Sequence, residues 1–112
     1  MFKKSDGKIA IYDMLIDFNL ALIEIAKVTA YGNQIPGRTP GSWRVVTEFE
    51  REYNNAKARH MMAGMFDQFD NESKLYHLAH DIWNGLALLQ KKLEDKERAI
   101  ANSGTDGSVK WI

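Results

Sequence analysis

The spacing of apolar residues predicts three helices and no strand. In the first, residues 13–30, apolar side chains recur at three- and four-residue steps, and further ones widen the stripe. A stripe this wide indicates packing on more than one side. The second helix is predicted over residues 47–66, where Thr47 and Glu50 fit a capping box. The third is predicted over residues 72–101. The expected fold is therefore all-α.

The second and third helices each have one apolar side, which we expect to be buried. On the second helix it comprises Ala58, Met61, Met62, Met65 and Phe66. On the third helix it comprises Leu75, Leu78, Ala79, Ile82, Leu86, Leu89 and Leu93. Opposite this stripe the third helix carries His77, His80, Asp81 and Asn84. This second side is either a solvated surface or a buried, ligand-facing cluster, since Lys and Glu serve solubility better than His and Asn.

Residues 32–46 form the one long loop that the pattern predicts. The segment holds three glycines and both prolines of the chain, and Gly32 is expected to cap the first helix in a left-handed conformation. Loops of this length in small domains are often functional. Residues 1–102 should form one helical domain, and residues 103–112 a flexible tail whose last four residues, VKWI, are apolar enough to dock on this subunit or a neighbour.

Composition and charge narrow the class of protein. The chain has 112 residues, 45% hydrophobic and 27% charged, as in an ordinary single globular domain. Fifteen basic residues balance fifteen acidic ones, so no overall field favours nucleic acid or a membrane surface. The absence of cysteine excludes disulfides and thiol chemistry. No apolar run has the length of a signal peptide or a membrane span, and the expected location is the cytoplasm.

All three histidines of the chain fall within twenty-one residues that also hold a D-x-x-D pair: His60, Asp67, Asp70, His77 and His80. Two carboxylates one helical turn apart can share a hard divalent cation. Taken alone, the D-x-x-D pair is equally consistent with two exposed aspartates, and it is the combination that suggests a site. Motifs for a P-loop, a dinucleotide fold, an HExxH zinc site and a serine nucleophile elbow are missing.

The same region carries a resemblance to a known family. Arg59-His60, the run from Asp67 to Ser73, and His77-Leu78-Ala79-His80 followed by Asn84 resemble the motifs of the phage-encoded dATP/dGTP diphosphohydrolase N-terminal domain (MazZ-like) family. The likeness covers about residues 8–90. Asp67 stands where the family has Glu, and Asp70 where it has Asp. Other positions depart from the pattern: Ile16 replaces Pro, Phe66 and Lys74 replace Gly, and Tyr76 replaces His.

The resemblance implies a purine deoxynucleoside triphosphate pyrophosphohydrolase that uses Mg²⁺ (or Mn²⁺), with a logic similar to MazG-type all-α pyrophosphatases. Asp67 and Asp70 would hold the metal, with His60 and His80 as further ligands or water positioners, so that Asp67 and His80 are the catalytic candidates. Trp43, Arg59 and Asn84 are the candidates for binding the nucleotide. The implied architecture is a compact bundle of about three main helices, completed by a second copy in a homo-oligomer.

Two other functions stay open at this stage. The first is a non-catalytic protein that sequesters a nucleotide signal in the same pocket. The second is an HD-type phosphohydrolase, because His80 and Asp81 form an HD dipeptide with His60 upstream. That class needs a further downstream aspartate, for which Asp95 in a charged run is a poor candidate.

Overall fold

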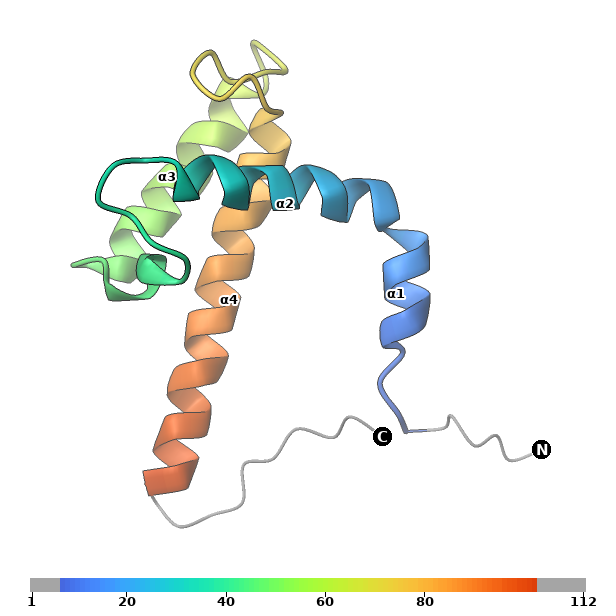
Figure 1. The fold of residues 1–112 in the computed structure, drawn as a ribbon, viewed down its shortest axis with the longest axis vertical. Coiled ribbons are helices and arrows are strands. Elements are labelled where there is room, and N and C mark those ends of the chain that lie inside the picture. Colours follow the sequence, from blue (N-terminus) through green and yellow to red (C-terminus); the bar gives the residue numbers. More distant parts are fainter. Residues whose placement is uncertain (1–6, 103–112) are drawn as a thin grey trace.

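The computed structural model describes residues 7–102, and this part of the chain is all-α, as the sequence predicts (Figure 1). The elements are α1 (Ile11–Asp17), α2 (Asn19–Asn33), the short 3₁₀ helix η1 (Ser42–Val45), α3 (Phe49–Ala63) and α4 (His77–Asn102). Within the described range no strand forms, and the only extended pairing is an isolated bridge between Phe69 and Tyr76.

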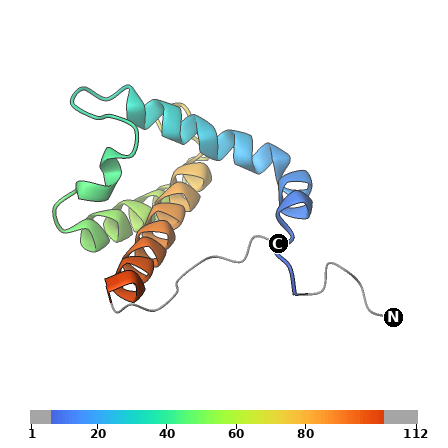
Figure 2. The ribbon, with the colours of Figure 1, turned by 60° about the horizontal axis from the view of Figure 1, so that its bottom comes forward.

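Helices α3 and α4 form an antiparallel pair, and α2 crosses this pair near the start of α4 (Figures 1 and 2). Helix α1 joins the N-terminal end of α2 at Phe18, where the chain bends, and it lies clear of the α3–α4 pair (Figure 1). None of the residues of α1 is buried. The packed part of the molecule is thus built from α2, α3 and α4, with η1 held against α4.

Several predicted helix limits are wrong. The helix expected over residues 13–30 is two helices, because the backbone leaves the helical region at Phe18 although the sequence has no Gly or Pro there. Gly32 lies inside α2 and does not cap it. The Thr47 capping box does not form: Glu48 is the N-cap, in a left-handed conformation with φ of 53°, and no side chain caps the helix.

The predicted inside and outside of α3 and α4 are also wrong in the single chain. The polar side of α4 is the buried one and comprises His77, His80, Asp81 and Asn84. The leucine stripe of α4 is exposed, apart from the small side chain of Ala79, and comprises Leu78, Ile82, Leu86, Leu89 and Leu93. Met61 and Met62 of α3 are exposed too, as are Met65 and Phe66 just after its end. The two helices meet through their polar sides because hydrogen bonds and an ion pair there satisfy the groups that are buried, as burial of polar atoms requires.

A cluster of aromatic rings joins the long loop to α3 and α4. The ring of Trp43 lies 5.8 Å from Phe49 and 6.1 Å from Trp83, and Phe49 lies 4.6 Å from Tyr53, between centroids. The Trp83 indole N–H donates to Thr29 Oγ1 of α2 at 2.9 Å. Edge and tilted ring contacts of this kind stabilise beyond the area they bury, so the cluster fixes the loop against the helices.

Two further sequence predictions concern the C-terminal tail and membrane-spanning helices. The flexible tail predicted over residues 103–112, with its VKWI end, lies outside the described residues. Of the helices within residues 7–102, none combines the length and apolar character needed to cross a membrane.

Candidate metal centre

The loop between α3 and α4 carries an aspartate back towards both helices. Lys74 has a φ of 64°, in the left-handed region, so a helix cannot continue through it and α4 begins at His77 instead of residue 72. Backbone bonds from Asp70 N–H to the Leu75 carbonyl (2.8 Å) and from His77 N–H to the Gln68 carbonyl (3.0 Å) close the loop. The Ser73 N–H donates to Asp70 Oδ2 at 2.8 Å and fixes the carboxylate.

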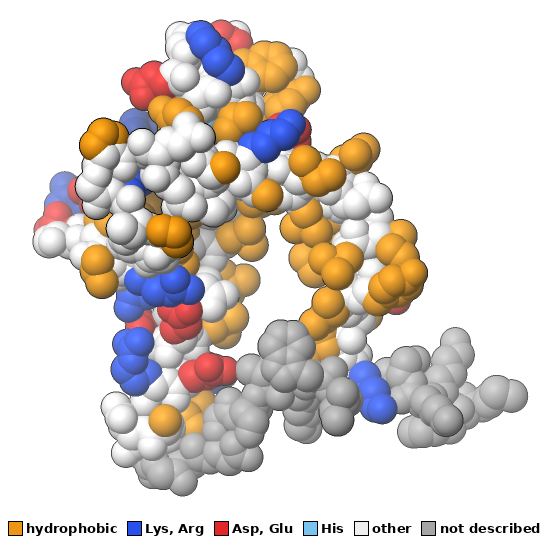
Figure 3. Space-filling model, viewed as in Figure 1, with side chains coloured by type: hydrophobic (Ala, Val, Ile, Leu, Met, Phe, Trp, Pro, Cys, Tyr) orange, Lys and Arg blue, Asp and Glu red, His pale blue; other side chains and the backbone are white. Residues whose placement is uncertain are grey.

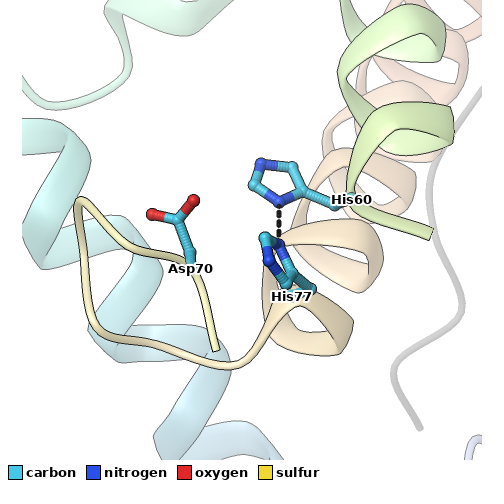
Figure 4. Close-up of side chains that lie close together, drawn as sticks. All are labelled: His60, Asp70 and His77. Carbon is cyan, nitrogen blue, oxygen red and sulfur yellow. Dashed lines mark hydrogen bonds between the residues drawn. The ribbon is translucent and has the colours of Figure 1, made fainter. Parts of the chain in front are cut away.

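His60, Asp70 and His77 converge on one point from three different segments (Figure 4). His60 comes from the last turn of α3, His77 from the first turn of α4, and Asp70 from the loop between them. One ligand atom from each residue lies within 4.8 Å of the others. His77 is buried, and the other two are half-buried. Two imidazoles and one carboxylate in this arrangement are able to hold a metal ion.

The two imidazoles approach each other closely, with 2.9 Å between their Nδ1 atoms (Figure 4). In the absence of a metal, one Nδ1 must carry a proton and donate it to the other. A metal ion can take the place of this proton, because adjacent ligand atoms bound at ~2.1 Å lie about 3 Å apart. Imidazole nitrogen suits Zn²⁺, Mn²⁺ and other first-row ions better than it suits Mg²⁺, which prefers oxygen.

His80 lies beside the triad and is held in place on two sides. Its ring stacks on that of His60, with centroids 4.4 Å apart and planes 9° apart. Its Nε2 is 2.7 Å from Ser73 Oγ, which also accepts a hydrogen bond from the Leu75 N–H. The edge of Tyr31 contacts the same ring, with 6.1 Å between centroids. His80 therefore positions the His60 ring and ties it to the loop.

The electrostatics favour the protonation states that metal ligands need. Burial, helped by the charges of His80 and His77, lowers the pKa of His60, and burial also lowers the pKa of His80. Desolvation acts to raise the pKa of Asp70, but hydrogen bonds from Ser73 and the nearby histidines outweigh it and lower this pKa. Neutral imidazoles beside an ionised carboxylate are the forms that bind a cation.

The predicted site residues do not all gather at this point. Asp67 is exposed, and its Oδ1 accepts a hydrogen bond from the Phe69 N–H in a local turn, outside the triad. Arg59 is exposed on α3. Asn84 is buried one turn after His80 and donates to the His80 carbonyl at 2.8 Å. His60 and Asp70 belong to the triad, and His80 adjoins it.

Asp81, the second residue of the HD dipeptide, faces away from the triad towards α3. Its Oδ1 lies 2.8 Å from Lys57 Nζ. This buried oxygen receives no well-aligned hydrogen bond, and the positive charge of Lys57 is what compensates for its burial. Because Asp81 is committed to this ion pair, the arrangement argues against an HD-type centre.

Trp43 lines a separate cleft of about 540 Å³ between the long loop, α2 and α4. Trp83, Arg38, Asn33 and Gln90 are among its other lining residues. Arg44 lies over the Trp43 ring at 4.4 Å and forms a bidentate ion pair with Glu94, which closes one end of the loop against α4. The volume is in the range of small-ligand sites, and the cleft begins about two turns along α4 from His77.

His77 is the one member of the triad that was not predicted as a metal ligand, although it belongs to the histidine cluster seen in the sequence. Its neighbour His80 stands three positions later, and spacing alone cannot distinguish the two because both lie on the same side of α4. The left-handed turn at Lys74, which sets the start of α4, decides which of them meets His60.

The fold and the triad together define a class: an all-α protein with a His₂–Asp group suited to a divalent metal. The model of the family described as dATP/dGTP diphosphohydrolase, N-terminal, matches residues 1–100, and the chain belongs to this family. No curated protein and no solved structure matches the chain. The description of this family links it to the hydrolysis of deoxynucleoside triphosphates.

Proposed function

We propose that this protein is a metal-dependent pyrophosphohydrolase of purine deoxynucleoside triphosphates, which splits a dNTP into a dNMP and pyrophosphate in the cytoplasm. The observation that carries the proposal is the convergence of His60, Asp70 and His77 in a chain of the dATP/dGTP diphosphohydrolase family. A divalent ion bound there supplies positive charge that neutralises and orients the triphosphate.

The donor set also bears on the identity of the metal. Two of the three groups are imidazoles, so we propose Mn²⁺ or a related first-row ion in preference to Mg²⁺. In this proposal His60 and His77 bind the metal through nitrogen, and Asp70 supplies the one anionic ligand. The ring of His80, stacked on that of His60, fixes the orientation of the His60 ring. Asp67 remains a candidate for a ligand or catalytic group only if the loop rearranges, because its side chain is engaged with Phe69.

We propose the Trp43 cleft as the site of the purine base. Aromatic side chains offer stacking surface, and the amides of Asn33 and Gln90 can pair with the polar edge of a base. Trp83 follows His77 by six residues on the same helix, which is ~9 Å along its axis. A nucleoside triphosphate is long enough to extend from this cleft to the metal centre.

The test is to incubate the protein with each of the four dNTPs and Mn²⁺ or Mg²⁺, and to measure dNMP and pyrophosphate. We expect purine-selective turnover that is faster with Mn²⁺, and a loss of at least 100-fold in His77→Ala and Asp70→Asn. The matched control Asp67→Asn should keep most of the activity. If Asp67→Asn loses as much as Asp70→Asn, the metal site is assigned wrongly.

The second candidate, a protein that sequesters a nucleotide, is favoured by one observation: the triad contains a single carboxylate, whereas the resemblance implies an acidic pair. The same assay separates the two functions. Retention of a purine nucleotide without any product, with or without metal, would support sequestration and contradict hydrolysis.

A further inference from the structure

The loop between α2 and α3 brings an arginine into the wall of the Trp43 cleft. Arg38 directly follows Gly37 and stands three residues before Gly41, and these two glycines have φ angles of 85° and 80°. Both angles lie in the left-handed region, which glycine adopts without strain. The Arg38 N–H donates to the Ile35 carbonyl at 3.1 Å. The backbone on both sides of Arg38 is thus held in turns, and the residue lines the cleft.

The cleft holds a positive charge that no neighbouring acid neutralises. Among the described residues that line it, Arg38 and Arg44 are basic and none is acidic. The charge of Arg44 is already paired, because its guanidinium contacts both carboxylate oxygens of Glu94 at 2.9 and 3.0 Å. These hydrogen bonds lower the pKa of Glu94 to about 2. Figure 3 shows basic and acidic side chains adjoining each other where η1 lies on α4.

Arg38 has no such counterion. It forms no ion pair with any residue of the described range 7–102. A guanidinium stays charged at every physiological pH and offers five N–H donors in a planar fork. Within a cleft of about 540 Å³, this charge is available to an anionic group of a ligand.

The guanidinium of Arg38 lies close to the aromatic rings of the cleft. Burial raises the pKa of Tyr53, and the positive charge of Arg38 opposes this rise, which requires the two groups to be near each other. The Tyr53 hydroxyl donates to the Trp43 carbonyl at 3.4 Å, and its ring lies 6.1 Å from that of Trp83 between centroids. A single ligand that combines a flat ring with an anion can therefore contact both the rings and the arginine.

We propose that Arg38 binds the α-phosphate of the nucleotide whose base lies in the Trp43 cleft, so that the cleft binds a purine deoxynucleoside monophosphate without the metal. This inference rests on the proposed function, which places the base there. The α-phosphate is the phosphate nearest to the sugar, so a cation in the same cleft is within its reach. Guanidinium groups bind phosphate through paired, charge-assisted hydrogen bonds.

Hydrolysis strengthens the contact with Arg38. In the triphosphate the α-phosphate is linked on both sides and carries a single negative charge. In the monophosphate it is a terminal monoester with about two negative charges near neutral pH. Arg38 therefore attracts the phosphate of the product more strongly than the same phosphate of the substrate. The monophosphate product should compete with the triphosphate for the cleft.

Calorimetric titration of the metal-free protein, with EDTA present, tests the contact by comparing dGMP with deoxyguanosine, which lacks only the phosphate. We expect dGMP to bind at least ~10-fold more tightly. Arg38→Gln should remove this advantage and leave the affinity for deoxyguanosine unchanged. Arg38→Lys should keep part of it, since lysine keeps the charge but not the fork. The matched control is Arg51→Gln, which removes an exposed arginine of α3 outside the cleft and should bind like the wild type.

Equal affinities of the wild type for dGMP and deoxyguanosine would overturn the inference. An Arg38→Gln variant that keeps the full advantage of dGMP would overturn it as well, and so would an equal loss in Arg51→Gln. The titration involves neither metal nor turnover, so its result is separable from the proposed function. Binding of dGMP through Arg38 without hydrolysis of any dNTP would support the inference and contradict the hydrolase, and hydrolysis without any gain from the phosphate would do the reverse.

Discussion

At the scale of single residues, the three histidines at the metal centre are the side chains on which the site depends most. His77 and His80 are buried and His60 is half-buried, so the polar atoms of these rings need hydrogen-bond partners. A buried polar group without a partner costs about 1–3 kcal/mol. Here the Nδ1–Nδ1 contact and the Ser73 hydroxyl provide the partners. The cluster is therefore compatible with a folded chain before any metal binds, provided that His60 and His80 stay neutral.

This requirement makes stability sensitive to mild acid. The folded pKa values of His60 and His80 lie below the ordinary value of 6.5. As pH falls through 6.5, the unfolded chain therefore takes up protons before the folded chain does. The contribution of these two histidines to the free energy of unfolding should therefore be greatest above pH 6.5 and should decrease as pH falls towards their folded pKa values. Urea unfolding of the metal-free protein at pH 7.5 and 5.5 measures the difference.

The variant His60→Gln/His80→Gln serves as the control for this pH effect. It keeps polar side chains at both positions but removes their titration, so its stability should change less between pH 7.5 and 5.5 than that of the wild type. Asp70 does not contribute in this window, because its pKa is already lowered from 3.8 and it stays ionised. Equal changes in the two proteins would contradict the assignment of the effect to these histidines.

At the scale of the elements, the loop between α3 and α4 determines the site. Lys74 adopts a left-handed backbone conformation, which glycine adopts without strain. Lys74→Gly should therefore stabilise the fold by about 0.5–1 kcal/mol, the left-handed penalty of ~1–2 kcal/mol less the added entropy of the unfolded glycine. Chemical denaturation measures it. Lys74→Ala has no such freedom and should not stabilise, and a gain in both variants would show that the lysine side chain, not the backbone, was the cause.

The same loop shows what the sequence can and cannot predict. The all-α fold and the long loop around Trp43 follow from periodicity and spacing, and the sequence also places the three histidines near Asp70. The break between α1 and α2 at Phe18 does not follow, because no Gly or Pro marks it. The start of α4 cannot be predicted in this way, because residues 72–76 contain no Gly or Pro. The left-handed Lys74 lies in the loop between Phe69 and Tyr76, which pair in an isolated bridge between residues apart in sequence. Because α4 begins at His77 and not at residue 72, His77 meets His60 at the site, which the predicted helix did not indicate. Asp67 lies in a separate turn, where it accepts a hydrogen bond from the Phe69 N–H.

At the scale of the whole molecule, the structure differs from the prediction mainly in which sides of α3 and α4 are buried. A single chain buries the polar sides of α3 and α4 against each other and leaves the leucine stripe to solvent. The sequence pattern marks both sides of α4 as suited to contact, but it cannot say which contact is made within the chain. A homo-oligomer, which the resemblance in sequence implies, would bury these apolar side chains, so that the apolar pattern and the polar metal centre are both satisfied.

Binding of one divalent metal by His60, Asp70 and His77 can be measured by spectroscopy of the Mn²⁺-loaded protein. Electron spin echo envelope modulation detects ¹⁴N nuclei of imidazoles bound to Mn²⁺. We expect two histidine nitrogens in the wild type and in Asp67→Asn, one in His77→Ala, and weaker Mn²⁺ binding in Asp70→Asn. A wild-type spectrum without ¹⁴N modulation, or one that His77→Ala leaves unchanged, would contradict it.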